Sequence, residues 1–271
     1  MIGFIAVASA FSYQSFSNNI SDPLSTPYPL NDIQSQHKFN VDSARKYVME
    51  MYNDSLGLVR ENAVSERYWL LSDNFLASLV LVKSYPAISK NITDTLQYYK
   101  NQFSIKYFSP WAVIDNEDRG EISFNASSDR QLTSKIWYTA YDGSNVLRCE
   151  DYADIAFLKS IYLYENNQFS EAKRCYDLGE NMFDGKGFKD HESGGSSRYT
   201  TYKLALWKIA DKMTPFGTKD SSVADAILIA MQDCSSGGVH THYNADLFPD
   251  SETNVETTSV SLMAFDLQYI G

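Results

Sequence analysis

The sequence lacks any run of Lys and Arg. Its 271 residues carry 23 basic and 34 acidic side chains, which gives a formal net charge of −11. Binding to a nucleic-acid backbone depends on clustered basic side chains that displace counterions. Attraction to an anionic membrane surface depends on the same charges. We therefore expect neither a nucleic acid nor a membrane surface as partner.

Long apolar runs are also lacking, so we expect no transmembrane segment. The N-terminal residues 1–14 are apolar, and Ala8-Ser9-Ala10 fits the cleavage site of a secretory signal, although the usual positive charges before it are missing. We interpret residues 1–14 as a signal-peptide remnant; the alternative is a short buried segment. The protein is then secreted or extracellular. Four N-x-[ST] sequons agree with a glycoprotein: Asn19, Asn53, Asn91 and Asn125.

Cysteine is scarce. The three cysteines are Cys149, Cys175 and Cys234, and their spacing matches no zinc site. An odd number permits one disulfide and one free thiol. Cys149 and Cys234 both lie near expected helix ends and could meet there. Cys175 falls inside an expected helix, where we interpret it as a small core residue. The G-x-S-x-G motif of serine hydrolases and the P-loop frame are missing as well.

The sequence does contain a repeated pattern. Residues 182–206 and 231–262 each run from an amphipathic segment through a Gly-rich turn and a polar loop into an apolar helix with a Thr-rich start, and residues 55–81 form a weaker copy. Repetition on this scale indicates stacked units of helices that share one core.

Apolar spacing of the helical kind predicts eight helices. They cover residues 41–58, 70–84, 89–105, 149–165, 168–184, 199–213, 219–233 and 254–267. Amphipathic segments alternate with dominantly apolar ones, as an outer and an inner ring of helices require. Residues 15–40 are rich in polar residues and proline and predict an extended lead-in. The insert at about 106–148 predicts one or two short β-hairpins within the domain 41–271.

These features resemble the α/α toroid architecture of six-hairpin glycosidases, polysaccharide lyases and terpene-cyclase-like proteins. The segment Gln232 to Val239 is similar to the Gln-then-Gly turns of cyclase-type toroids, with Val239 where those repeats carry Trp. The resemblance covers residues 41–271 and implies an all-α fold. It implies a ring of helical hairpins. We count about four hairpins, whereas such rings have five to seven, so we expect a ring that is open, completed by the insert at 106–148, or truncated at Gly271.

The resemblance implies that the N-terminal ends of the inner helices line one mouth, where polar and anionic ligands are favoured. Glycoside hydrolysis needs two carboxyl groups, one as acid and one as base or nucleophile. We interpret Asp73, Asp151 and Glu256, each from a different inner helix, as catalytic candidates. The alternative is that they only cap their helices.

Other polar and aromatic residues fall near the same helix starts. His240 and Tyr243 are further catalytic candidates, because histidine can act as a general base. Aromatic faces stack on sugars, and polar groups orient them. We expect an oligosaccharide or other small molecule as ligand, held by these substrate-binding candidates: Trp69, Asn74, Tyr152, Arg198, Tyr199 and His242.

We expect no cofactor and no metal. The alternative is a metal ion at His240 and His242, which an H-x-H spacing in extended backbone puts on one face, or in the acidic loop 245–256. Two functions follow from the sequence. The first is an exported carbohydrate-active enzyme, a glycoside hydrolase or polysaccharide lyase. The second is a non-catalytic cell-surface or binding protein on the same scaffold.

Overall fold

The computed structural model describes residues 38–105, 110–114, 123–193, 197–217 and 221–266. The expected signal remnant and nearly all of the lead-in lie outside these residues. Within them the chain forms eight α-helices and four small sheets. The helices account for 49% and the strands for 17%, so the fold is mixed α/β and the expected all-α toroid is wrong. None of the described helices is both long and apolar enough to cross a membrane.

The eight helices lie within the segments that the apolar spacing predicted, apart from their ends. They are α2 (Val41–Glu50), α3 (Leu71–Leu81), α4 (Pro86–Phe103), α5 (Ala153–Glu165), α6 (Phe169–Asn181), α7 (Thr201–Met213), α8 (Ser222–Ala230) and α9 (Val255–Phe265).

The first helix is shorter than expected. It ends at Glu50, and the chain continues into a hairpin of β1 (Tyr52–Asn53) and β2 (Leu58–Val59). Gly57 lies in the hairpin turn at φ +66°, where a Cβ would stand 2.4 Å from Thr95 Oγ1 of α4. Glycine is therefore needed in a tight turn that packs against α4.

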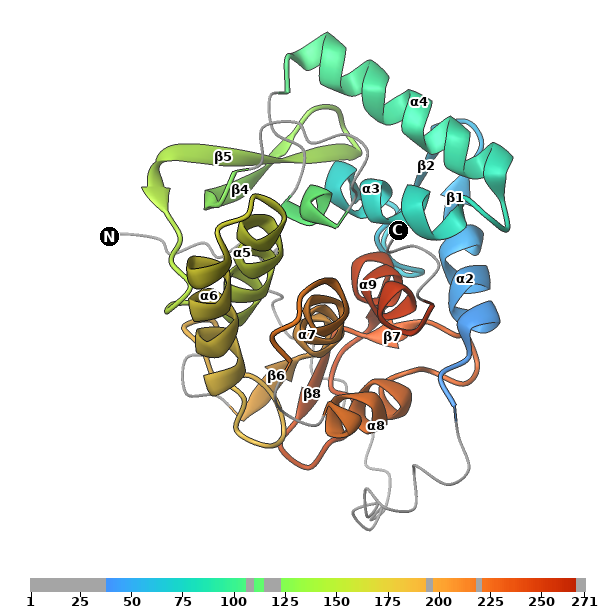
Figure 1. Cartoon of the computed structure of the whole chain (residues 1–271). Coiled ribbons are helices and arrows are strands. Elements are labelled where there is room, and N and C mark those ends of the chain that lie inside the picture. The colour runs from blue at the N-terminus through green and yellow to red at the C-terminus, as the bar shows by residue number, and fades with distance from the viewer. Residues whose placement is uncertain (1–37, 106–109, 115–122, 194–196, 218–220, 267–271) are drawn as a thin grey trace.

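The helices form two layers (Figure 1). Along the chain, α3 packs against α4, α5 against α6 and α7 against α8. Most residues of α3, α5, α7 and α9 are buried, whereas α2, α4, α6 and α8 bury mainly one face. In the inner layer α9 packs between α3 and α7, and α5 packs on the other side of α7. The alternation of apolar and amphipathic segments predicted this layering.

The strands explain why the fold is not all-α. The insert forms the expected hairpin, β4 (Asn125–Gln131) and β5 (Ile136–Val146), and β5 also pairs in parallel with β3 (Trp69–Leu70). Two small sheets join β6 (Arg198–Thr200) to β8 (His242–Asn244) and β7 (Val239–His240) to β9 (Thr253–Asn254). The inner helices α3, α7 and α9 each begin directly after a strand. Long-range pairing therefore fixes where these N-terminal ends lie.

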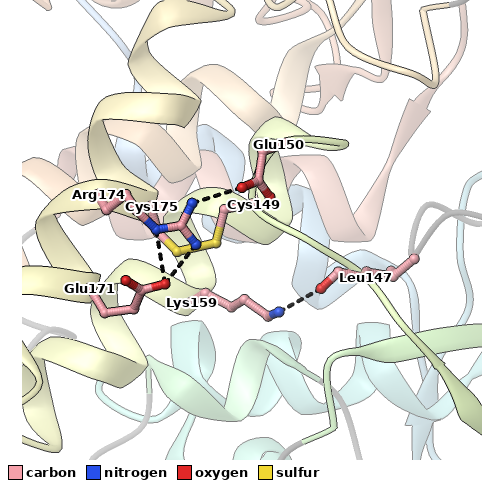
Figure 2. Close-up of a disulfide and its surroundings, with 7 residues drawn as sticks. All are labelled: Leu147, Cys149, Glu150, Lys159, Glu171, Arg174 and Cys175. Atoms are coloured by element: carbon pink, nitrogen blue, oxygen red, sulfur yellow. Dashed lines mark hydrogen bonds and ion pairs between the residues drawn. A yellow bond between two sulfur atoms is a disulfide. The ribbon is translucent and has the colours of Figure 1, made fainter.

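A disulfide joins Cys149, just before α5, to Cys175 in α6 (Figure 2). The expected approach of Cys149 to Cys234 is wrong, and Cys234 is a free, exposed thiol. Both bonded cysteines are buried between α5 and α6. Beside them, Arg174 of α6 pairs with Glu150 at 2.7 Å, so a covalent and an ionic link hold the same two segments together.

Replacing both bonded cysteines by serine is expected to lower the free energy of unfolding by about 3–4 kcal/mol. The bridge closes a loop with a sequence separation of 26, and cross-linking a loop of that length restricts the unfolded chain by about this amount. Urea denaturation of the wild type and of the double variant measures the difference. Cys234→Ser serves as the control, and a loss as large in that variant would contradict the assignment.

Candidate active site

The N-terminal ends of the four inner helices each carry a buried ionisable residue in the first turn. These residues are Asp73 in α3, Asp154 in α5, Lys203 in α7 and Glu256 in α9. An ionisable group is costly to bury unless it is paired or uncharged. Four such groups at neighbouring helix ends therefore make this end of the molecule the candidate site. Three carry acid groups, which the positive end of a helix dipole favours, and Lys203 departs from that rule.

An acid cluster surrounds Glu256, and we define it as Glu61, Asp73, Asp129 and Glu256. Burial and the neighbouring carboxylates of Glu61 and Asp129 raise the pKa of Glu256 to about 8. Burial, and then the carboxylate of Glu256, raises the pKa of Asp73 well above its usual range. Asp73 is 2% exposed and Glu256 9% exposed. Ionisation is therefore disfavoured in the inner half of the cluster, and Glu256 is mostly protonated at neutral pH.

Glu61 and Asp129 form the outer half of the acid cluster, where each is only partly buried. Burial raises the pKa of Glu61 to about 7, with Asp129 and Glu252 adding to the shift. The backbone fixes Glu61 beside Glu256, because the N–H of Val255 donates to the carbonyl of Glu61 at 2.7 Å. Asp129 comes from β4, where it accepts a hydrogen bond from Thr139 at 3.0 Å.

A lysine cluster occupies the neighbouring helix ends, and we define it as Lys203, Asp190, Glu192 and Asp154. Lys203 pairs with Asp190 at 2.7 Å and also with Glu192. Burial alone would lower the pKa of Lys203, but the carboxylates of Glu192, Asp154 and Asp190 raise it above its usual range. Asp190 additionally accepts a hydrogen bond from the N–H of Ala153, the first residue of α5. Lys203 thus stays charged and offsets part of the negative charge of its acidic neighbours.

Trp111 and Tyr202 lie between the two clusters. Trp111 lies in the short helix η1 (Pro110–Val113), and its indole N–H donates a hydrogen bond to Glu256. Its ring meets that of Tyr202 edge-on, with the centroids 5.7 Å apart. The hydroxyl of Tyr202 donates to Asp154 at 2.8 Å. Aromatic rings therefore separate the acid cluster from the lysine cluster, and each ring makes a polar contact with one of them.

The predicted catalytic residues divide into two groups. Asp73 and Glu256 are brought together, as described. Asp151 lies elsewhere: Arg148 binds it at 2.9 Å and lowers its pKa, and His191 stands 3.7 Å away. The buried acid at the start of α5 is Asp154, three residues further on. A catalytic role for Asp151 stays a prediction, but the geometry favours Asp154 for this helix end.

His240 and Tyr243 lie in the small sheets before α9. His240 Nδ1 is 2.6 Å from the carbonyl of Ser251. Tyr243 is fully buried and donates to the carbonyl of Lys186 at 2.8 Å. Its ring stacks on that of Tyr199, which donates to Asp184 at 2.7 Å. These contacts engage the polar atoms of both tyrosines within the fold.

The remaining substrate-binding candidates also make contacts within the protein. Asn74 is buried and binds both backbone groups of Val59 at 2.7 and 2.9 Å, which ties α3 to β2. Trp69 is buried and donates to the carbonyl of Glu66. Arg198 pairs with Asp250 at 2.9 Å near the surface. Their proposed contacts with a ligand stay predictions.

Tyr152 and His242 are the last two candidates. Tyr152 is buried, and its ring meets that of His191 edge-on. Burial lowers the pKa of His242 to about 4, and Arg198 adds to that shift. His242 Nδ1 is 2.9 Å from the hydroxyl of Thr241. Within the described residues no group of three or more His, Cys, Asp or Glu side chains is arranged to hold a metal ion.

The comparisons with known proteins give no match. No family model, curated protein or solved structure is significantly similar to this chain.

The sequence missed several members of this arrangement. Asp154 and Lys203 were assigned no role from the sequence, although each stands in the first turn of an inner helix at a position comparable with Asp73. Glu61 and Asp129 carried no such signal, since one lies in a loop and the other in a polar strand. They reach Glu256 only through the pairing of distant segments.

The raised pKa values predict that the protein loses stability as the pH rises from 6.5 to 8. The folded-state pKa values of Glu256 and Glu61, about 8 and about 7, lie above their ordinary value of 4.5. The folded protein then binds more protons than the unfolded chain, and the resulting stability disappears as the pH passes those values. We expect a loss of about 2–4 kcal/mol across this range.

The window avoids the opposing effect of His242, whose pKa lies below its ordinary value, so that its contribution changes only between about pH 4 and 6.5. Urea denaturation at several pH values between 6.5 and 8 checks the prediction. A free energy of unfolding that stays constant or rises across this range would show that the acid cluster is ionised at little cost.

Proposed function

We propose that this chain is an exported carbohydrate-active enzyme that cleaves glycosidic bonds by acid/base catalysis, as a hydrolase or a lyase. One observation carries the proposal: four carboxyl groups with raised pKa values lie together, two of them buried and two of them partly exposed. Glycoside cleavage needs one carboxyl group that is still protonated near neutral pH and a second that is ionised. Pairs of titratable groups in different environments are typical of active sites.

Glu256 is assigned the role of general acid. Its pKa of about 8 keeps it protonated at neutral pH, and the indole N–H of Trp111 fixes its orientation. In a hydrolase, the glycosidic C–O bond breaks as Glu256 gives its proton to the leaving oxygen. Glu61, with a pKa of about 7, is partly ionised and lies on the outer side of the cluster, so it takes the proton of the attacking water.

Asp73 supports this pair. It lies deeper than Glu256, and its raised pKa shows that a second negative charge is disfavoured there. Groups that interact in this way titrate as a unit, so ionisation of one disfavours ionisation of the other. Two buried aromatic residues border the cluster: the indole N–H of Trp111 donates to Glu256, and the ring of Trp111 packs edge-on against that of Tyr202.

Export is supported by the disulfide. The Cys149–Cys175 bridge is of a kind that persists in oxidising compartments and is rare in the cytosol. The negative net charge suits a secreted protein that avoids nucleic acids and anionic surfaces.

A non-catalytic binding protein is the second candidate. The lysine cluster favours it, because Lys203, Asp190 and Glu192 satisfy one another within the fold. Charges paired in this way build a rigid end of the molecule and leave fewer groups for chemistry. In that case the same helix ends recognise an oligosaccharide without cleaving it.

The test is a screen of neutral and acidic polysaccharides with the purified protein between pH 5 and 8. Reducing-end assays detect hydrolysis, and absorbance of unsaturated products detects a lyase. Glu256→Gln is the matched control, because it keeps the size and hydrogen bonding of the side chain but cannot give up an acidic proton. Turnover that the control lacks supports the enzyme, and binding without turnover supports the second candidate. Turnover that survives in Glu256→Gln contradicts the assignment of Glu256 as the general acid.

A further inference from the structure

Three of the four N-x-[ST] sequons lie in the described part of the chain, and their surroundings differ. In N-glycosylation the side-chain nitrogen Nδ2 of the asparagine attacks the anomeric carbon of an oligosaccharide carried on a lipid diphosphate. The new C–N bond replaces the sugar–phosphate bond, the nitrogen loses a proton, and the lipid diphosphate leaves. A folded protein tolerates the sugar only where the asparagine side chain is exposed.

Asn53 meets this requirement. It is exposed in the hairpin of β1 and β2, as is Ser55 of the same sequon. Its Oδ1 atom accepts a hydrogen bond from the N–H of Leu56 at 3.1 Å, which fixes the orientation of the side chain. Within the part of the chain that the structure describes, Nδ2 of Asn53 has no hydrogen-bond partner. A glycan there displaces no contact of the fold.

Asn91 lies close to the same hairpin. It is exposed on the N-terminal half of α4, as is Thr93 of its sequon. Its Nδ2 atom makes one long contact of 3.3 Å with the hydroxyl of Tyr52, the neighbour of Asn53. Because Gly57 packs against Thr95 of α4, the hairpin rests on the helix that carries Asn91. The two acceptor residues therefore share one face of the molecule.

Asn125 is a poorer acceptor. It is only partly exposed in β4, where it pairs with Val146 of β5. Ser127 of its sequon is buried and lies opposite Tyr141. Because β4 is paired with β5 and Ser127 is buried, the glycosylating enzyme has little access to this sequon.

We propose that Asn53 and Asn91 carry N-linked glycans, which together cover the face formed by the β1–β2 hairpin and the N-terminal half of α4, and that Asn125 stays unmodified. The Cys149–Cys175 disulfide supports passage through the oxidising compartment in which such glycans are added. The glycan-covered face is thereby closed to protein partners. This inference does not depend on the proposed enzymatic function.

The test sends the full chain through the secretory pathway of a eukaryotic cell behind a standard signal peptide. Mass spectrometry of glycopeptides from the secreted protein then reports the occupancy of each asparagine. We expect Asn53 and Asn91 to be largely occupied and Asn125 to be empty. Occupancy at Asn125, or an empty Asn53 or Asn91, overturns the proposal.

Variants separate loss of the acceptor from loss of the fold. Ser55→Ala removes the first sequon but keeps the Asn53 side chain and its hydrogen bond to Leu56. Thr93→Ala removes the second on an exposed helix position. Each is expected to shift the secreted protein by one glycan on a gel, and Asn125→Gln is expected to leave it unchanged. An unchanged gel position for Ser55→Ala or Thr93→Ala also overturns the proposal.

Discussion

Replacing Lys203 by methionine is expected to lower the free energy of unfolding by about 3–5 kcal/mol. The side chain of Lys203 is 2% exposed, and that of its partner Asp190 is 0% exposed. Removing the ammonium group leaves the carboxylates of Asp190 and Glu192 beside Asp154 with no positive charge among them. Breaking a buried ion pair from one side is costly because the remaining charge keeps its desolvation penalty. Urea denaturation at pH 7 measures the loss.

Lys208→Met is the matched control. Lys208 lies on the same helix, α7, and pairs with Asp225, whose side chain is 39% exposed. Water solvates Asp225 once its partner is gone, so we expect a loss of about 1 kcal/mol or less. Equal losses in the two variants would mean that burial of the partner does not determine the cost.

A combined variant checks the cause. Lys203→Met with Asp190→Asn and Glu192→Gln removes the positive and the two negative charges together. If the single replacement is destabilising because of stranded charge, the triple variant should recover much of the lost stability. A triple variant as unstable as the single one would point to lost packing of the lysine stem instead.

Glu256→Gln is expected to raise the free energy of unfolding by about 1–3 kcal/mol at pH 8 while lowering turnover by about 10²–10⁴-fold. Glutamine removes a carboxyl group that repels Asp73 and Glu61, and it can still accept the hydrogen bond from Trp111. The gain in stability should shrink toward pH 6.5, where Glu256 is protonated in the folded protein. Residues that destabilise a fold are often kept because function needs them.

Glu66→Gln is the control for net charge. It removes one negative charge at an exposed position of the neighbouring loop. We expect its stability to stay within about 0.5 kcal/mol of the wild type across the same pH range. If Glu256→Gln changes the stability no more than Glu66→Gln does, Glu256 does not destabilise the fold by repelling Asp73 and Glu61. This stability measurement holds whether or not the protein is an enzyme.

The sequence predicted the helices because their signal is local. The apolar residues of α7 and α9 repeat at helical spacing within a single segment, and the polar starts of both helices precede that spacing. From the same pattern the sequence also placed Asp73 and Glu256 at helix starts. Their mutual approach needed the packing of α3 against α9, which no local pattern contains.

The strands and the disulfide could not be predicted in the same way. β3 has only two residues, and it pairs with a strand that begins at Ile136. Such a strand exists because of its distant partner, not because of its own composition. Cysteine pairing has the same character: Cys175 lies within a helix, and its bond to Cys149 depends on how α5 and α6 pack. The all-α expectation failed because these short, long-range pairings leave no periodic trace.

The position of α9 has a consequence for biosynthesis. This helix packs between α3 and α7 and against α2, yet it is the last described helix to be synthesised. On the ribosome the earlier helical pairs can form as they emerge. The inner layer is incomplete, however, until α9 has left the exit tunnel and packs between α3 and α7. During that interval the apolar sides of α3 and α7 have no partner in α9. We therefore expect the nascent chain to depend on chaperones until α9 has emerged from the ribosome.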